Sequence, residues 1–341
     1  MTRRSLHPSW REAAMGGASV ALAGCATAPS VLRPESAPQH TLATLGWWLI
    51  IVGSAVIVIV LAIELVTLRH RGRTVADTPL VASPGSTRGI VVGLAITAVV
   101  TLAFFIYSAV VLGATERPRG RPGAKIEIIG HQWWWEARYL GGTPDQAVAT
   151  ANELHIPIGV PVALQVTSAD VIHSFWIPQL QGKIDVIPGI RNTFWIRADT
   201  AGTFHGQCAE FCGLQHAHMM LTVTAEDARS FQRWLAAQSA PAAAAPPSDT
   251  AAAAGGRAFM SSACALCHTV RGTGAHGILG PDLTHVASRH MLGAGAVRNT
   301  PGALNAWITD APSLKPGADM PRIDLTPATM HAIVAYLQTL R

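Results

Sequence analysis

Residues 207–219 read Gln-Cys-Ala-Glu-Phe-Cys-Gly-Leu-Gln-His-Ala-His-Met. They place two thiols, an imidazole and a thioether in one short stretch. Sulfur and imidazole ligands suit copper. A further imidazole, His173, stands upstream in the segment His-Ser-Phe-Trp-Ile-Pro. Together these residues offer two bridging thiolates, one imidazole for each of two metal ions and a thioether. The pattern favours a binuclear copper site.

Two other interpretations fit the cysteines of this stretch. Cys208 and Cys212 alone are also compatible with a disulfide or with a structural zinc site. Neither alternative uses His216, Met219 or His173, so copper accounts for more of the pattern.

Short strand-like pieces between Gly and Pro turns surround the copper stretch. They predict a β-sandwich or barrel. The expected strands are 126–129, 133–138, 153–157, 162–168, 193–197 and 220–223. A closing helix is expected next, with Thr224 as its N-cap and Asp227 completing a capping box.

Two long apolar runs precede the strands. The first, Leu42–Leu68, holds one charge, Glu64, and the second, Ile90–Ala114, holds none. Each is long enough as a helix to cross a hydrocarbon core of ~30 Å. We therefore expect a two-helix transmembrane hairpin over residues 42–114.

The N-terminus has the pattern of an export signal. Arginines precede a short apolar stretch that ends Leu22-Ala23-Gly24-Cys25, which resembles a lipoprotein processing site. We expect residues 1–24 to be a signal peptide, Cys25 to receive a lipid, and residues 25–41 to form a periplasmic segment. An ordinary signal peptide is the alternative.

The basic excess of the chain belongs to its membrane part. Residues 1–124 hold 11 Arg against 5 acidic residues, whereas residues 125–341 hold 14 basic against 15 acidic residues. This distribution gives no indication of nucleic acid as a partner.

A second soluble domain follows an Ala- and Pro-rich linker at 239–256. It contains Cys264-Ala265-Leu266-Cys267-His268, in which two thiols can bind the haem vinyl groups and His268 the iron. This spacing is the c-type haem attachment motif, which places the domain outside the cytoplasmic membrane. A thioredoxin-like pair or a zinc site would not require His268.

Residues 257–341 resemble an all-α class I cytochrome c. The resemblance implies that Gly280–Leu283 backs the haem and that Met320, followed by Pro321, is the sixth iron ligand. The closing helix is expected to start with Thr326 as N-cap and Pro327 at N1. Other candidate ligands are Met260, Met291, Met330, His276, His285, His290 and His331.

Several stretches closely resemble subunit II of haem-copper cytochrome c oxidases. They are Gly130–Glu136, Thr167–Pro178, Gly182–Asp185, Pro188–Gly189 and the copper stretch. The resemblance implies an all-β cupredoxin domain over 115–238 with a copper A centre. Its implied ligands are the bridging thiolates of Cys208 and Cys212, His173 and His216, and the weak axial groups Met219 and the Glu210 carbonyl.

The same resemblance implies roles for two more side chains. Glu210 would also reach a magnesium ion at the boundary with subunit I, and Trp133 would mark where electrons arrive. Of the three tryptophans 133–135, at least one is expected to be purely structural, because a strand alternates its faces. In the family, the second membrane helix usually begins with a proton-admitting Glu, whereas this chain has Gly-Ser-Thr-Arg-Gly at 85–89.

The implied function is that of subunit II of an aa-type terminal oxidase in the bacterial inner membrane. Because a cytochrome c domain is fused to the subunit, the oxidase would be of the caa type. Electrons from cytochrome c or a quinol:cytochrome c reductase would pass through haem c and copper A to the haem of subunit I. Oxygen reduction, coupled to proton translocation, would occur outside this chain. Subunit III and membrane lipid are further expected partners. The alternatives are a nitric oxide reductase subunit and a periplasmic copper-delivery protein.

The two soluble domains differ in charge. Residues 125–238 hold 7 basic against 10 acidic residues, and residues 249–341 hold 7 against 5. Opposite charge favours encounter, so we expect the haem domain to dock near Trp133 with a rate that falls with ionic strength. A salt-independent rate would indicate a fixed arrangement.

Overall fold

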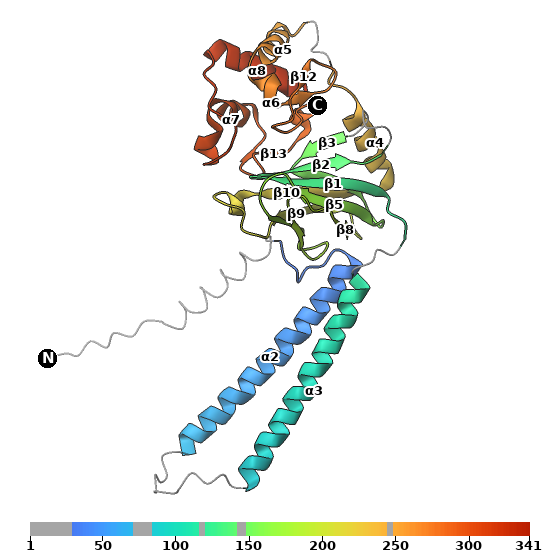
Figure 1. Ribbon diagram of the computed structural model, residues 1–341, viewed down its shortest axis with the longest axis vertical. Helices are drawn as coiled ribbons and strands as arrows, with labels where there is room; N and C mark the ends of the chain where they lie inside the picture. The colour runs from blue at the N-terminus through green and yellow to red at the C-terminus, as the bar shows by residue number, and fades with distance from the viewer. Residues whose placement is uncertain (1–28, 71–83, 116–119, 142–147, 244–247) are drawn as a thin grey trace, which may run out of the picture.

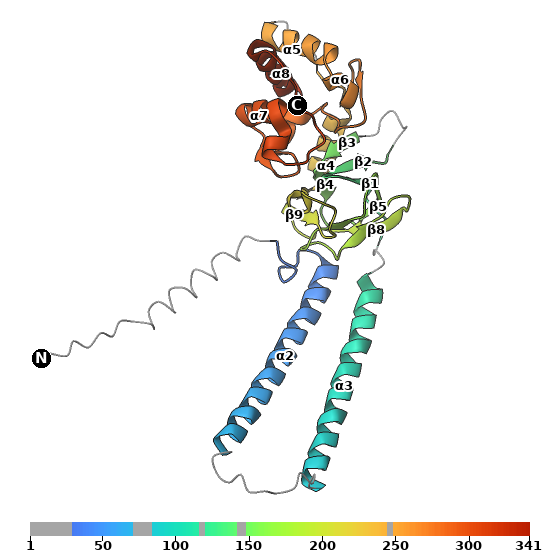
Figure 2. The same cartoon turned by 60° about the vertical axis from the view of Figure 1, so that its left-hand side comes forward.

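The computed structural model describes residues 29–70, 84–115, 120–141, 148–243 and 248–341. The predicted signal peptide and the lipidation site Cys25 lie outside these residues. In Figures 1 and 2 a helical hairpin extends from one end of a β-sandwich, and a helical domain lies against the other end.

The hairpin consists of α2, Ala37–His70, and α3, Pro84–Thr115. Both helices are long and apolar enough to cross a membrane. Each begins earlier than its apolar run predicts. For α2 the reason is Ser36, whose hydroxyl accepts a hydrogen bond from the N–H of Gln39 at 3.2 Å and so caps the helix. Arg88, expected ahead of the second helix, lies inside α3.

Two five-stranded sheets form the sandwich. Their strand orders are β3-β2-β1-β5-β8 and β4-β10-β9-β6-β7. The strands are β1 Ala124–His131, β2 Trp134–Tyr139, β3 Val148–Ala151, β4 Glu153–Pro157, β5 Val162–Ser168, β6 His173–Trp176, β7 Ile184–Val186, β8 Asn192–Ile196, β9 Gly202–Cys208 and β10 Met220–Glu226. β1 pairs in parallel with β5, and β10 with β4, whereas the other pairs are antiparallel. The six expected strands are confirmed, and β3, β6, β7 and β9 are additional.

The core of the sandwich is built from side chains that alternate along its strands. Trp135, Phe175, Leu164 and Ile126 are each at most 2% exposed and lie in one apolar cluster. Burying large side chains of this kind contributes about 1.5–3 kcal/mol each. The rigid sandwich is the frame that holds the copper stretch.

The helix after the last strand starts later than the sequence predicts. α4 spans Ala228–Ser239, and its N-cap is Asp227, which accepts hydrogen bonds from the N–H groups of Arg229 and Ser230. The predicted N-cap, Thr224, is wrong, because β10 continues to Glu226 by parallel pairing with β4.

The C-terminal domain is helical. Its helices are α5 Thr250–Ser261, α6 Cys264–Cys267, α7 Pro301–Leu314 and α8 Pro327–Thr339. The side chain of Thr326 accepts a hydrogen bond from the N–H of Thr329, which confirms the predicted cap of α8.

The predicted linker is too long at its C-terminal end. Residues 250–256 belong to α5, which begins with Asp249 as N-cap. Ala252 and Gly255 are buried there. A methyl group built on Gly255 would lie 1.8 Å from the carbonyl oxygen of Ala332 in α8. The small residues therefore allow two helices to pack closely, rather than forming a flexible tether.

Candidate functional site

Strand pairing brings the predicted copper ligands to one end of the sandwich. His173 opens β6, and Cys208 closes the neighbouring strand β9, where it pairs with Phe175. The N–H of Cys208 donates to the carbonyl of Met219 at 2.9 Å, which closes the loop between β9 and β10. Ligands 35 and 11 residues away from Cys208 therefore meet there.

The donor atoms of this loop lie within about 4 Å of their neighbours. The sulfurs of Cys208 and Cys212 are 3.8 Å apart. Nδ1 of His173 lies 3.9 Å from the Cys208 sulfur, and Nδ1 of His216 lies 3.7 Å from the Cys212 sulfur. The Met219 sulfur is 3.9 Å from the Cys212 sulfur, whereas the Glu210 carbonyl is 3.2 Å from the Cys208 sulfur.

This arrangement fits two thiolate-bridged metal ions better than either alternative. Both cysteines are free thiols, and their separation is far beyond the ~2.05 Å of a disulfide bond. Each sulfur has its own imidazole, the thioether lies beside the Cys212 sulfur, and the carbonyl lies beside the Cys208 sulfur. A single tetrahedral zinc would leave two of these six groups unused.

The environment favours a thiolate at Cys208. Hydrogen bonding from the Cys212 thiol lowers the pKa of Cys208 to about 3, against the opposing effect of burial, and His173 adds to the lowering. The neighbouring thiolate raises the pKa of Cys212. A bound metal ion supplies the positive charge needed to deprotonate both.

Asp170 orients the imidazole of His173, a role that was not predicted. Its Oδ1 lies 2.8 Å from Nε2 of His173, which leaves Nδ1 facing the Cys208 sulfur. Burial acts to lower the pKa of His173, but the interactions with Asp170 and Cys208 together outweigh it and the pKa is raised. A carboxylate three residues before an imidazole ligand is a signal that could have identified this residue.

Replacing Asp170 with asparagine is expected to weaken copper binding by about 10- to 100-fold, since partners that orient a ligand contribute that much. Copper titration of the apoprotein against a competing chelator measures the change. Asp185→Asn is the control, because Asp185 lies exposed on β7, the neighbour of β6. Equal affinities in the two variants would contradict the role of Asp170.

The three tryptophans at 133–135 have different environments. Trp135 is 2% exposed and packs edge-on against Phe175, which confirms that at least one of the three is structural. Trp134 stacks on His131. Nε1 of Trp133 donates to the carbonyl of Cys212 at 3.0 Å, so its indole is bonded directly to the copper loop.

The helical domain lies against the same loop. A methyl group built on Gly317 would lie 3.1 Å from the ring of Trp133 and 3.2 Å from the side chain of Leu214. The expected docking near Trp133 is confirmed. Glu210 is exposed on the other part of the loop, where it is free to face a partner protein.

The haem attachment motif has the geometry its chemistry requires. Nδ1 of His268 donates to the carbonyl of Pro281 at 2.8 Å, so its Nε2 is available to bind iron. A methyl group on Gly280 would lie 2.5 Å from the imidazole, which shows how closely the 280–283 segment backs His268. Cys264 and Cys267 are free thiols on α6. The residues present therefore fit a covalent haem.

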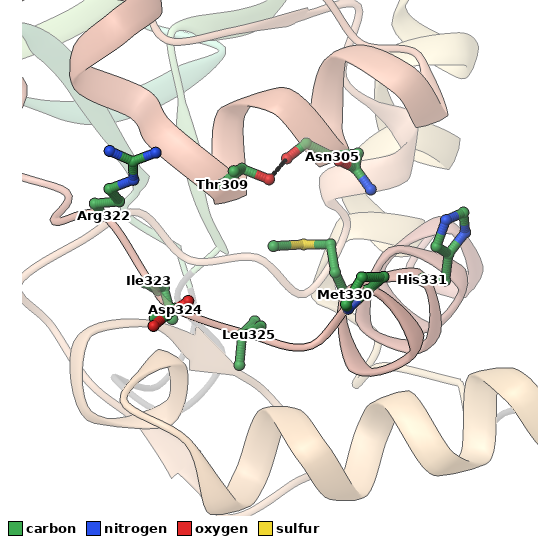
Figure 3. Close-up of a pocket in the computed structure, with 9 residues that line it drawn as sticks. Asn305, Thr309, Arg322, Ile323, Asp324, Leu325, Met330 and His331 are labelled. Carbon is green, nitrogen blue, oxygen red and sulfur yellow. Dashed lines mark hydrogen bonds between the residues drawn. The ribbon is translucent and has the colours of Figure 1, made fainter.

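Two of the other candidate iron ligands, His285 and Met330, have defined surroundings. Both ring nitrogens of His285 lie near carbonyl oxygens, of Arg341 at 2.7 Å and of Ala240 at 3.1 Å. Met330 points across a cavity of about 600 Å³ toward Thr309 of α7 (Figure 3), and neither haem thiol lines this cavity. Met320 packs against the domain core in the loop before α8.

Comparison with known proteins agrees with this division of the chain. Residues 141–226 match the family model of the cytochrome c oxidase subunit II periplasmic domain, and residues 252–341 match that of cytochrome c. The structure of the periplasmic domain of cytochrome oxidase subunit II from Bradyrhizobium japonicum is 31% identical, covers 34% of this chain and 94% of that chain, and gives a TM-score of 0.32.

Two curated relatives match more than half of the chain. Cytochrome c oxidase subunit 2 of Alkalihalophilus pseudofirmus is 36% identical over 217 residues, which are 63% of this chain and 61% of the relative. That of Bacillus sp. (strain PS3) is 29% identical over 259 residues, which are 73% and 71%. This chain thus spans less than two thirds of the first relative. Both domain families are matched in order, so the chain carries a domain of the cytochrome c oxidase subunit II periplasmic type followed by a C-terminal cytochrome c domain.

Proposed function

We propose that this chain is the electron-input subunit of a caa-type cytochrome c oxidase. Electrons from cytochrome c or a quinol:cytochrome c reductase enter through the helical domain, cross to the copper loop, and leave toward the haem of subunit I, where oxygen is reduced and protons are translocated. The carrying observation is the set of six donor groups at the copper loop, with a haem attachment domain packed against it.

The residues of the copper loop have distinct roles in this proposal. Cys208 and Cys212 would bridge the two ions, His173 and His216 would each bind one, and the Met219 sulfur and Glu210 carbonyl would bind weakly. A thiolate-bridged copper pair shares one unpaired electron, so its surroundings reorganise little on reduction. The strands on both sides hold the ligands rigidly, which preserves that property. The exposed Glu210 carboxylate would bind magnesium at the boundary with subunit I.

The membrane hairpin and the soluble domains indicate the location. α2 and α3 would anchor the chain in the bacterial inner membrane beside subunits I and III, with both soluble domains on the periplasmic side. Covalent haem attachment outside the cytoplasm supports this orientation. Lipidation of Cys25 would add a second anchor.

Purification of the native complex with metal and haem analysis and an oxygen uptake assay tests the proposal. We expect copper, covalent c-type haem and oxygen consumption in a complex that contains a large membrane subunit. Measuring whether the complex reduces oxygen or nitric oxide also distinguishes an oxygen reductase from a nitric oxide reductase. Absence of copper, or of a membrane partner, would refute the proposal.

His268 and Met320 would be the two axial ligands of the haem iron. Replacing Met320 with alanine is expected to lower the haem midpoint potential on the order of 0.1 V, because a thioether ligand raises it. The long-wavelength sulfur-to-iron band should weaken as well. Redox titration and absorption spectra measure both, with Met330→Ala as the control, since Met330 is a buried methionine of the same domain. An unchanged band in Met320→Ala would rule Met320 out.

A further inference from the structure

Lys315, one of three lysines in the chain, is buried between the two soluble domains. It caps the C-terminal end of α7 and is only 4% exposed. Lysine is almost never buried to this extent without partners. The position of its ammonium group therefore calls for an explanation.

The ammonium of Lys315 donates three hydrogen bonds to backbone carbonyls. They go to Trp133 at 2.8 Å, His218 at 2.9 Å and Gly293 at 2.8 Å. An ammonium has three N–H donors, so all are used. Burial lowers the pKa of Lys315 to about 8, and the group stays protonated at neutral pH. Two acceptors belong to the copper domain and one to the haem domain, so a single side chain joins both.

The residues after Lys315 continue the contact. The Gln215 side chain donates to the carbonyl of Pro316 at 2.9 Å. Gly317 has φ +86°, and its missing side chain lets the backbone lie directly against Trp133. Met320 follows three residues later. The segment 315–317 therefore contacts the indole that is bonded to the Cys212 carbonyl, and the proposed haem ligand follows this segment in the chain.

Other contacts between the domains combine backbone hydrogen bonds with one long ion pair, in which Nδ1 of His290 lies 3.7 Å from a carboxylate oxygen of Glu153. The N–H of Met220 in β10 donates to the carbonyl of Ala294 at 3.1 Å. The carboxylate of Glu153 accepts from the N–H of His290 at 2.7 Å. Hydrogen bonds between groups that are already in contact depend less on ionic strength than the encounter of two oppositely charged surfaces does. They favour the fixed arrangement over the salt-dependent docking expected from net charge.

We propose that Lys315 is a positioning residue, whose ammonium holds segment 315–317 of the haem domain against Trp133 so that electrons cross between the domains at this contact. One electron crosses per event, with oxidation on the haem side and reduction on the copper side. This inference rests on the proposed function. It adds the structural element that keeps the electron-donating haem domain and the electron-accepting copper domain in one relative position.

The test compares the full-length wild type with Lys315→Met. Flash reduction of the haem domain, followed at the haem and copper bands, is expected to show transfer slowed by at least about tenfold, since tenfold corresponds to one charge-assisted hydrogen bond and the change removes three. Hydrogen exchange at the Met220 N–H, which needs no cofactor, should accelerate by a similar factor. Lys125→Met is the matched control, because Lys125 is exposed on β1.

Lys315→Arg, which keeps charge and donors, should recover part of the rate. If Lys315→Met loses either cofactor, Lys315→Gln, which keeps two donors, replaces it and should fall between methionine and wild type. An unchanged transfer rate with both bands intact would overturn the proposal. If the wild type itself shows no transfer between the domains, the proposed function fails, and exchange at Met220 alone decides whether Lys315 holds the interface.

Discussion

Cys208→Ser is expected to lose the copper centre completely. The Cys208 sulfur lies next to the Cys212 sulfur, Nδ1 of His173 and the Glu210 carbonyl, so it is the atom that would join both ions. A serine hydroxyl is a hard donor that stays protonated, whereas Cys208 is held as a thiolate. The loss of affinity should exceed the roughly 10- to 100-fold of a change at an orienting residue.

Copper content and the copper absorption bands of the purified protein measure this result. The reciprocal control is Cys264→Ser, which removes a thiol from the haem domain. It should lose one of the two thioether bonds to haem and keep its copper, since α6 contributes no residue to the copper loop. Copper retained in Cys208→Ser would show that another group bridges the ions.

The second large effect is expected on stability. Gly255→Ala places a methyl group 1.8 Å from the Ala332 carbonyl oxygen, which is backbone and cannot rotate away. Helices α5 and α8 must separate, and overpacking of this kind costs about 1–3 kcal/mol or more. For a domain of this size, 1 kcal/mol shifts Tm by roughly 4–8 °C. We expect the haem domain to melt about 10–20 °C lower.

Thermal melting followed at the haem absorption band tests this, with Gly256→Ala on the same helix as control. A methyl group there meets the ring of Tyr336 at 3.3 Å, and a small shift of that ring relieves the contact. Alanine also gains about 1 kcal/mol over glycine in a helix. Gly256→Ala should therefore melt near the wild type. Equal melting of the two variants would show that α5 does not pack as closely as the structure indicates.

Sequence patterns predicted the parts of the fold that depend on local chemistry. The apolar runs gave both membrane helices, and the alternation at 153–157 and 162–168 gave two strands with their observed bounds. β9 was missed although its burial alternates, because two of its buried positions are Gly206 and Cys208, which do not read as apolar strand residues. The burial of these β9 residues is set by strands β6 and β10, with which β9 pairs.

The cluster of candidate copper ligands could be predicted because soft donors in one loop have few other uses. Asp170 lies only three residues before His173, so its orienting role had a local signal, whereas Lys315 acts through groups distant in sequence and its role depends on the fold. Lys315 gave no local signal, since its three acceptors are backbone carbonyls separated from it by 22 to 182 residues. The predicted C-terminal boundary of the linker was wrong for a similar reason. Gly255 is a glycine because it packs against the Ala332 carbonyl of α8, a contact that the local sequence does not reveal.

The covering of Trp133 by Gly317 has a consequence for how this surface evolves. A protein that meets a diffusing partner must keep its contact face compatible with a surface encoded by another gene. Here both faces are inherited on one polypeptide, so a change at Leu214 can be compensated by a change in residues 315–317 of the same chain. On the proposed function, selection for binding an external electron donor acts on the surface of the helical domain. The surface around Trp133 is then free of that selection.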